Sequence, residues 1–440
     1  MVGKIEWSIS ERRSKVMLAD RTPEMMAAAG SGHHLVLGPG EGLESTWIAA
    51  GLELPDLAAM RRYRVERTVE QLHRFGYDGA VLMDPMNIRY VTDSTNMQIW
   101  VMHNAARYAW VGADGRVILW DYMGCEFLSA HHEGLHDIRA ATSSDYFIAG
   151  QRYDEKADQS AAEIAALARE TAGPTPRIAI DRTNVATMLA LQRAGLVIGN
   201  GQEVMEQARR IKSSDELLAM RCAVHACEST MAEMREILEP GMTEREVWAM
   251  LHAGNIRRAG EWVETQILAS GSRTNPWFQE ASSRVIENGD LVAYDTDLVG
   301  AYGMMVDISR TWIAGDAPVR APAQHAFDLA LEQITRNIEM LRPGVTFKEL
   351  SLDAWFPSVD DYRHYSCLFH GVGQCDEVPD IYFPQFWESA GYDGVLEPGM
   401  VMTVEAFVGA RSGGEGVKLE NQVVITADGP ELLTRFPLDL

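Results

Sequence analysis

Acidic side chains interrupt apolar, β-branched runs in the C-terminal half of the chain. The segment DLVAYDTDLVGAYGMMVDISRTW (290–312) holds Asp295, Asp297 and Asp307 between runs that have the composition of buried strands. Asp295 and Asp297 are two residues apart, so a strand would point both toward one side, and Asp307 falls on the return strand of a hairpin. Three ionised carboxylates on one hairpin face repel one another unless a proton or a cation neutralises them. The hairpin therefore predicts a cation site.

Three further apolar segments each contain a polar group that can bind a metal. These are SCLFHGVGQCDEVPD (366–380) with His370, PGMVMTVEAFVGA (398–410) with Glu405, and GVKLENQVVIT (416–426) with Glu420. An unpaired glutamate in a buried strand is unfavourable, so both glutamate-bearing strands require a bound partner. The six side chains together supply enough ligands for two divalent ions: Asp295, Asp297, Asp307, His370, Glu405 and Glu420. An oxygen-rich set with one imidazole suits iron, manganese, cobalt or zinc.

The remainder of the chain has the patterning of an α/β protein. A length of 440 residues exceeds one ordinary domain. Helical spacing over residues 56–79 ends at Gly76, and a strand–helix alternation continues as far as TMLALQRAG (187–195). We predict an N-terminal extension over residues 1–58, an α/β domain over 59–207 and a second domain over 208–440.

The second domain contains a faint internal repeat. ILEPGMTEREV (237–247) and MLRPGVTFKEL (340–350) each place a Pro-Gly stop after one helix and a threonine where the next helix would be capped. At the start of the domain, Ser213 or Ser214 with Glu216 close behind predicts the N-cap of a long helix. We expect two similar halves with a site between them.

Composition and charge argue against several classes of function. The apolar runs are too short to span a bilayer, and the first residues lack the apolar core of a secretory signal. Five cysteines without a CxxC pair indicate reduced thiols rather than disulfides or a zinc ribbon. A formal net charge of -24 disfavours nucleic acid and anionic membranes as partners. We therefore expect a cytoplasmic protein that acts on a small molecule.

The order Asp, Asp, His, Glu, Glu on strands resembles the pita-bread superfamily of methionine aminopeptidase, prolidase and creatinase. RRIKSSDELLAMRCA resembles its interdomain linker, and DISRTW, FHGVG, LEPGMVMTVE and GVKLENQVVIT resemble its later motifs. The resemblance runs from about residue 59 to the end. It implies an α+β protein with a creatinase-like α/β N-terminal domain, a C-terminal pita-bread domain with a pseudo-twofold repeat, and a homodimer. It maps the metal ligands onto Asp297 or Asp295, then Asp307, His370, Glu405 and Glu420.

Three departures separate this chain from the peptidases of that superfamily. Peptidases carry HGxGxxxHExP, whereas this chain reads HGVGQCDEVP, one residue shorter, with Asp376 where the second histidine would stand. A further peptidase histidine is replaced within NPWFQ, where Trp277 stands. The peptidase aspartates are eleven apart, whereas Asp307 lies ten residues after Asp297 and twelve after Asp295. We therefore expect an extra aspartate to join the metal set.

The altered pattern resembles the DddP-type dimethylsulfoniopropionate (DMSP) lyases of marine bacteria. This resemblance implies cleavage of DMSP, a small zwitterionic sulfonium, to dimethyl sulfide and acrylate, with iron as the expected metal. Metal ions would neutralise the charge that develops when the proton α to the carboxylate is removed, and Asp376 is the candidate base. The sulfonium is expected to lie against the aromatic rings of Trp277, Tyr365 and Trp100. The departing sulfide is neutral and needs no acid, which agrees with the lost histidines.

Other functions stay open at the level of the sequence. A dinuclear aminopeptidase or prolidase-like hydrolase would keep the fold and the metal, but would need histidines at or near Asp376 and Trp277. A non-catalytic pita-bread binding protein would be expected to lose metal ligands, which this chain retains. A lyase or hydrolase acting on another small cation, such as a betaine, is also compatible with the motifs.

Overall fold

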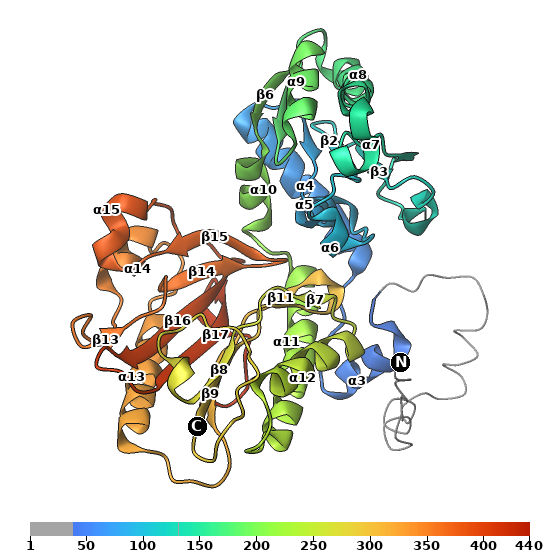
Figure 1. The fold of residues 1–440 in the computed structure, drawn as a ribbon. Helices are drawn as coiled ribbons and strands as arrows, with labels where there is room; N and C mark the ends of the chain where they lie inside the picture. Colours follow the sequence, from blue (N-terminus) through green and yellow to red (C-terminus); the bar gives the residue numbers. More distant parts are fainter. Residues whose placement is uncertain (1–37, 131) are drawn as a thin grey trace, which may run out of the picture.

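The computed structural model describes residues 38–130 and 132–440, which form two bodies (Figure 1). The first 37 residues of the expected N-terminal extension lie outside the described residues. From residue 38 onward this segment forms α3 (Gly40–Ala49), which packs on the C-terminal body through the buried Trp47. The ring centroids of Trp47 and Tyr302 are 5.7 Å apart. This part of the extension therefore belongs to the core of the C-terminal body.

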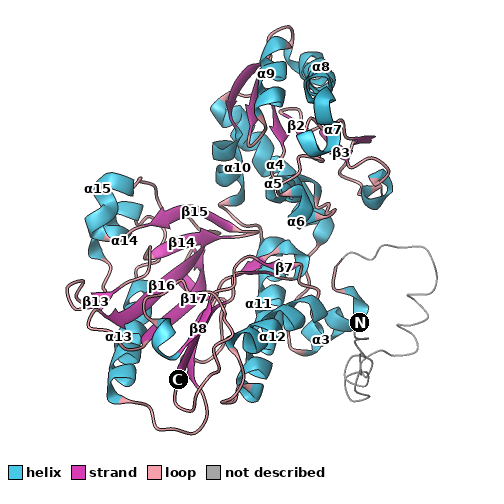
Figure 2. Ribbon diagram, in the orientation of Figure 1, coloured by secondary structure: helices cyan, strands magenta, loops and turns pink. Residues whose placement is uncertain are grey.

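The N-terminal body is a mixed sheet with helices on both faces (Figure 2). In the described residues its strand order is β4-β3-β2-β1-β5-β6, in which β1 runs antiparallel to β2 and parallel to β5. The strands are β1 (Gly79–Leu82), β2 (Tyr108–Gly112), β3 (Val117–Asp121), β4 (Asp137–Ala140), β5 (Arg177–Ile180) and β6 (Val197–Asn200). The helices are α4 (Leu57–Phe75), α5 (Pro85–Thr92), α6 (Gln98–Val101), α7 (Tyr146–Ala149), α8 (Tyr153–Ala172), α9 (Val185–Arg193) and α10 (Gly201–Arg209).

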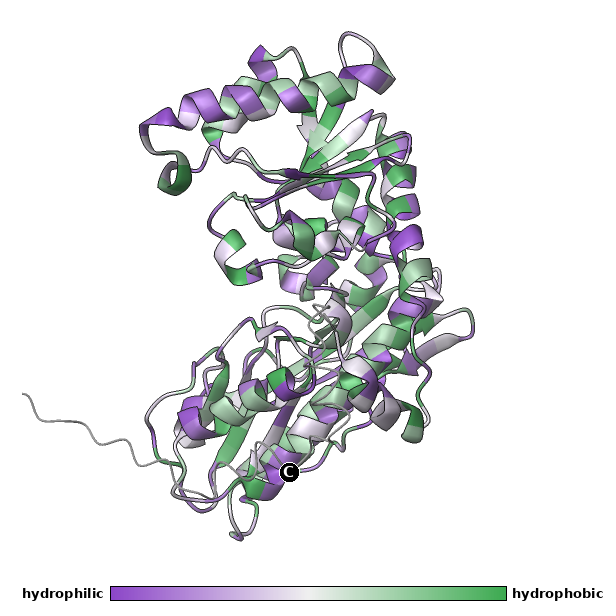
Figure 3. Ribbon diagram, turned by 90° about the vertical axis from the view of Figure 1, so that its right-hand side faces the viewer, coloured by the Kyte–Doolittle hydropathy of each residue, from purple (hydrophilic) through white to green (hydrophobic). Residues whose placement is uncertain are grey.

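Each face of this sheet has its own apolar core. Ile164 of α8 and Leu191 of α9 pack on one face, whereas Leu72 of α4 and Val204 of α10 pack on the other. The ribbon in Figure 3 shows the consequence, because helices carry apolar residues on one side and polar residues on the opposite side. As predicted, α4 ends at Gly76, whose φ of 69° is the left-handed conformation that glycine adopts without strain.

The C-terminal body is built from two helix-covered strand layers that meet edge to edge. One layer contains β12-β9-β8 and β11-β10-β7, and the other contains β15-β14-β16-β17-β18, with β13 paired to β16. The strands are β7 (Trp262–Val263), β8 (Leu268–Ser270), β9 (Leu291–Asp295), β10 (Leu298–Val299), β11 (Met305–Val306), β12 (Ser309–Ile313), β13 (Tyr362–Arg363), β14 (Phe369–Val372), β15 (Asp376–Ile381), β16 (Val401–Ala410), β17 (Gly416–Thr426) and β18 (Gly429–Leu432). The helices are α11 (Ser214–Ile237), α12 (Glu244–Arg257), α13 (Ala321–Ile338), α14 (Phe347–Asp353) and α15 (Trp387–Ala390).

Each of these layers has its own large apolar core. Helices α11 and α12 bury residues such as Met231 and Leu251 against β9 and β12, whereas α13 and α14 bury residues such as Phe327 against β16 and β17. The layers are joined by Thr311 of β12, whose hydroxyl donates to the Lys418 carbonyl at 2.9 Å and accepts from the Lys418 amide at 2.9 Å. Because the helices cover the outer faces, polar strand residues can gather between the two halves.

The helix starts predicted from the sequence are present. Ser213 caps α11 and exchanges hydrogen bonds with Glu216 in a capping box. Thr243 and Thr346, the equivalent positions of the two repeated segments, cap α12 and α14 in the same way. The local repeat is therefore structural. In the described part of the chain, none of the helices combines the length and apolar character needed to cross a membrane.

We predict that Asp121→Ala lowers the free energy of unfolding by about 3–5 kcal/mol, because it leaves a buried guanidinium without its counterion. Arg107 and Asp121 are both 0% exposed, and the Nε–Oδ1 distance between them is 2.9 Å. Asp158→Ala is the matched control, since Asp158 forms a solvent-exposed pair with Arg193 and its loss should change little. Urea unfolding followed by tryptophan fluorescence measures both variants. Equal stability of the two variants would contradict this prediction.

Candidate metal centre

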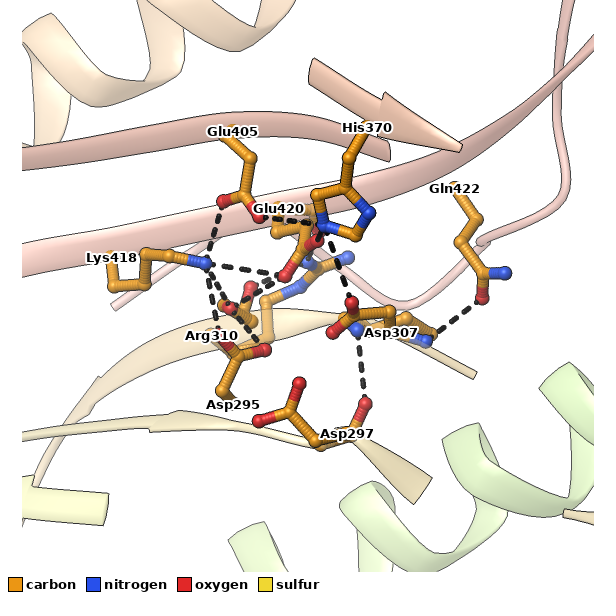
Figure 4. Close-up of polar contacts among 12 residues, drawn as sticks. Asp295, Asp297, Asp307, Arg310, His370, Glu405, Lys418, Glu420 and Gln422 are labelled. Atoms are coloured by element: carbon orange, nitrogen blue, oxygen red, sulfur yellow. Dashed lines mark hydrogen bonds and ion pairs between the residues drawn. The ribbon is translucent and has the colours of Figure 1, made fainter. Parts of the chain in front are cut away.

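The six predicted ligands converge between the two halves of the C-terminal body (Figure 4). Each side chain belongs to a residue that is at most 9% exposed. Glu405 and Glu420 are direct register partners on β16 and β17, so the antiparallel pairing places their carboxylates side by side. Asp295 ends β9, His370 lies on β14, and Asp307 lies between β11 and β12. The fold thus brings together groups separated by more than a hundred residues of sequence.

His370 is at the centre of one group of candidate ligands. Its Nε2 lies 3.3 Å from Glu405 Oε1, 3.5 Å from Asp307 Oδ2 and 3.8 Å from Glu420 Oε1. Ligand atoms of Asp307, His370 and Glu420 all lie within 4.8 Å of one another, and so do those of Asp295, Asp297 and Asp307. The two groups share Asp307, as expected where one carboxylate serves two neighbouring cations.

The chemistry of this donor set fits divalent cations. Asp307 Oδ1 and Glu420 Oε1 are buried and have no hydrogen-bond partner in the described structure. Unsatisfied buried carboxylate oxygens are unfavourable, and a hard or borderline cation is the partner that satisfies them. His370 Nδ1 lies 3.1 Å from the carbonyl oxygen of Gly371, which leaves Nε2 directed at the carboxylates. The residues present can therefore hold metal.

Asp297 reaches the centre by a different route from the one predicted. The sequence suggests that Asp295 and Asp297 share one face of one strand, but β9 ends at Asp295 and Asp297 has a left-handed φ of 36°. Between them, the Thr296 hydroxyl accepts from the Ile308 amide and donates to the Val306 carbonyl, each at 2.9 Å. The Thr265 hydroxyl then donates to the Asp297 carboxylate. A bend in the backbone, rather than strand alternation, directs both aspartates toward Asp307.

Lys418 is a site residue that the sequence reasoning missed. Its side chain is 0% exposed, and its Nζ lies 2.7 Å from Glu405 Oε2, 3.1 Å from Asp295 Oδ2 and 3.2 Å from Glu420 Oε2. It also donates to Ser309 Oγ at 2.7 Å. The segment GVKLE contains the evidence for this position, because Lys418 is two residues before the predicted ligand Glu420, and residues two apart on a strand share a face. Lys418 thus supplies a fixed positive charge beside the carboxylates.

The centre includes carboxylates whose pKa is raised and a carboxylate whose pKa is lowered. Burial and the neighbouring Glu420 raise the pKa of Asp307 well above its ordinary value, and burial with Asp295 raises the pKa of Asp297 to about 8. Burial opposes ionisation of Asp295, but Lys418 and Ser309 hold its pKa below the ordinary value. Burial likewise favours neutral His370, yet Glu405 and Asp376 raise its pKa to about 9. A cation entering the site therefore competes with bound protons.

The centre adjoins a pocket of about 320 Å³ with Asp376 at its mouth. Asp376 starts β15, its side chain is 65% exposed, and its Oδ1 lies 3.6 Å from His370 Nδ1. Desolvation raises the pKa of Asp376, whereas His370 acts to lower it. The pocket is also lined by Glu206, Tyr365, Ser366, Cys367, Glu377, Val378, Asp380 and Tyr392. Asp376 thus reaches the pocket without belonging to either ligand group.

Of the three aromatics predicted to hold a cation, Tyr365 lines this pocket. Its ring centroid lies 4.3 Å from Lys418 Nζ, and Phe278 stacks on it at 5.0 Å. Trp277 is 6% exposed and packs against Phe407, outside the pocket lining. Trp100 lies in the N-terminal body, where it contacts Tyr122 and Phe147, and is likewise absent from the lining. Roles for these two tryptophans in substrate binding stay predictions.

Comparison with protein families and solved structures confirms the expected fold. Residues 64–211 match the creatinase/prolidase N-terminal domain, and residues 218–427 match metallopeptidase family M24. The Xaa-Pro dipeptidase from Bacillus anthracis superposes with a TM-score of 0.69 at 23% identity, covering 86% of this chain and 98% of that one. The chain is therefore a creatinase-like N-terminal domain followed by a pita-bread domain.

Sequence comparison separates two kinds of relative. The Xaa-Pro dipeptidase of Pyrococcus furiosus is 33% identical over 54% of this chain and 67% of its own length. The dimethylsulfoniopropionate lyase DddP of Roseovarius nubinhibens is 45% identical over 96% of this chain and 95% of the relative. The protein of the same name from Roseobacter denitrificans is 44% identical over 96% of this chain and 94% of the relative. With Asp376 in place of the peptidase histidine, this chain belongs to the family of the DddP dimethylsulfoniopropionate lyases.

Proposed function

We propose that this protein cleaves DMSP to dimethyl sulfide and acrylate by β-elimination, with Asp376 as the general base. The observation that carries this proposal is the position of Asp376, which replaces a peptidase histidine and stands 3.6 Å from His370 at the mouth of the pocket. The 45% identity to a relative named as a DMSP lyase supports the same activity. A carboxylate base suits removal of a proton α to a carboxylate, whereas peptide hydrolysis requires the imidazoles that are missing.

We propose that the centre holds two divalent ions, with iron expected and manganese, cobalt or zinc as alternatives. The proposed ligands are Asp295, Asp297, Asp307, His370, Glu405 and Glu420. When bound, such cations supply positive charge for the substrate carboxylate. Against the effect of burial, Lys418 and Ser309 hold the pKa of Asp295 below its ordinary value, and they orient both Asp295 and Glu420 through contacts of 2.7–3.2 Å, so less rearrangement is needed when a cation binds.

The proton and electron movements balance with one base. Asp376 takes the α-proton, the C–H electron pair forms the double bond of acrylate, and the C–S pair leaves with neutral dimethyl sulfide. Because its side chain is 65% exposed, Asp376 can return the proton to solvent before the next turnover. His370 Nδ1 lies 3.6 Å from the same carboxylate, which is longer than a hydrogen bond.

We propose that the sulfonium end lies against the part of the Tyr365 ring that Lys418 and Phe278 leave uncovered. This ring lines the pocket, and the carboxylates of Glu206 and Asp380, which also line it, give the pocket negative charge. An aromatic face and carboxylates both attract a cation that cannot donate a hydrogen bond. The five cysteines are free, which supports the cytoplasmic location that we infer, and the superfamily resemblance supports a homodimer.

We predict that the intact protein releases dimethyl sulfide from DMSP and that Asp376→Ala lowers kcat by about 10²–10⁴-fold, the contribution typical of a general base. Headspace gas measurement gives the rates, and metal analysis should show unchanged metal content. Asp380→Asn is the control, because Asp380 lines the same pocket but pairs in register with His370 and does not occupy the position of the peptidase histidine, so its loss should mainly raise KM. No gas from the intact protein, together with cleavage of X-Pro dipeptides, would reject the lyase in favour of a hydrolase.

We predict that Tyr365→Leu raises KM for DMSP by about tenfold, since a cation–π contact contributes from about 0.5 kcal/mol at exposed sites to about 2 kcal/mol when desolvated, and about 1.4 kcal/mol corresponds to tenfold. Tyr365→Phe keeps the aromatic face and should retain a KM near that of the original protein. Initial rates at varied DMSP concentration distinguish the two variants. An unchanged KM in Tyr365→Leu would remove Tyr365 from the sulfonium site.

We predict that the metal-free protein loses stability as pH rises from about 5 to 9, and that added metal largely removes this loss. The pKa values of Asp297 and His370, raised to about 8 and about 9, mean that the folded state binds more protons than the unfolded state over this range. The raised pKa values of Asp307 and Glu420 act in the same direction. Thermal unfolding of chelated and reloaded protein at several pH values measures the effect. Increasing stability of the chelated protein with pH would contradict the assignment.

A further inference from the structure

Glu377, the residue that follows the proposed base, is buried between two cations of the interdomain linker. Its side chain is 1% exposed, with Oε2 2.7 Å from Lys212 Nζ and Oε1 3.2 Å from Arg209 Nε. The side chains of Arg209 and Lys212 are themselves 4% and 3% exposed. Buried charges of this kind are held tightly, because separating them leaves an uncompensated ion.

The same carboxylate fixes the loop between β14 and β15. The Gln374 amide donates to Glu377 Oε1 at 3.2 Å. A Cβ on Gly373 would lie 2.3 Å from Glu377 Oε1, and a Cβ on Gly371 would lie 2.5 Å from the Val378 carbonyl oxygen. The glycines of the FHGVG motif are therefore required because Glu377 and its neighbour occupy the space that a side chain would need.

The contacts of Glu377 continue into the N-terminal body. Arg209 donates to the Asn87 side-chain oxygen, and Asn87 donates to Asp181 at 2.9 Å. The Val378 amide donates to Glu206 Oε2 of α10 at 3.1 Å. The start of β15 is thus attached at two points to α10 and, through Asn87, to the sheet of the N-terminal body.

Asp376 itself has few restraints. Its side chain is 65% exposed, and 3.6 Å from its Oδ1 to His370 Nδ1 is longer than a hydrogen bond. A base must be placed within a fraction of an ångström of the proton that it takes, and a displacement of about 1 Å lowers a rate by about 100-fold. Because the side chain of Asp376 has few contacts of its own, the backbone on either side of it must hold it in position.

We propose that Glu377, held by Arg209 and Lys212, is a positioning residue that fixes the position of Asp376. Through these contacts, the position of Asp376 also depends on how the N-terminal body packs against β15. This inference rests on the proposed function, because it assigns Glu377 a role through the base of that reaction. Glu377 is a member of neither candidate ligand group, and its contacts are to the linker cations and the Gln374 amide, so we infer that it acts through the loop rather than through the metal.

A double-mutant cycle tests this role in the metal-loaded, full-length protein. Glu377→Gln should lower kcat by about 10–100-fold with KM changed by less than about threefold and metal content unchanged. In the Asp376→Ala background the same substitution should cause no further loss, because the residue through which it acts is absent. A proportional loss in that background would show a general structural effect and overturn the inference.

Lys212→Met provides a milder variant that leaves Arg209 in place, and Lys212→Arg should restore most of kcat by keeping the charge. Arg210→Met is the matched control, since Arg210 is the neighbouring linker cation and pairs instead with Glu397. Full kcat in both Glu377→Gln and Lys212→Met would overturn the inference. Equal losses in Lys212→Met and Arg210→Met would also overturn it.

Hydrogen exchange separates the inference from the proposed function. Peptides that contain the Gln374 and Val378 amides should exchange at least about tenfold faster in Glu377→Gln, because the Gln374 amide loses its charged acceptor and the backbone next to Val378 loses the ion pairs that hold residue 377. Arg210→Met should leave their exchange unchanged. If the intact protein releases no dimethyl sulfide, the lyase function fails, and unchanged exchange in Glu377→Gln would overturn the positioning role independently.

Discussion

Five carboxylates share one buried volume with His370 and Lys418, and the rest of the C-terminal body is arranged around this cluster. Burial of so much like charge is unfavourable unless cations compensate it. Lys418 provides one fixed positive charge, and the unsatisfied oxygens of Asp307 and Glu420 can bind further cations. Two helix-covered cores flank the cluster, which keeps water away from the charges and strengthens every interaction among them.

The same frame can serve different reactions because the groups that move protons stand outside the ligand set. The superfamily resemblance places a peptidase histidine where this chain has Asp376, at the mouth of the pocket and 3.6 Å from His370. Replacing an imidazole by a carboxylate at this position changes the available chemistry while the strands that hold metal ligands are kept. The loop from Gly371 to Glu377 permits this replacement of histidine by aspartate. Buried contacts, rather than the reactive side chain, hold the backbone of the loop in place.

Much of the fold and of the site could be predicted from local patterns. The end of α4 at Gly76 and the capping boxes at Ser213, Thr243 and Thr346 depend on interactions within a few residues. Asp307, His370, Glu405 and Glu420 stood out because a polar group in an apolar strand needs a partner wherever the strand lies. Asp297 was found for a partly wrong reason, because the bend after Asp295 depends on contacts between Thr296 and the neighbouring β11–β12 segment.

The sequence by itself determined which charged side chains would be buried, since the alternation of apolar and acidic residues is a local property of each strand. Only the tertiary structure decided how those charges are compensated. Three features join residues far apart in the chain. Lys418 lies among three carboxylates, Trp277 packs against Phe407, and Arg209 and Lys212 pair with Glu377. Such pairings follow from how layers and bodies pack against one another, and nothing in the neighbouring residues specifies them.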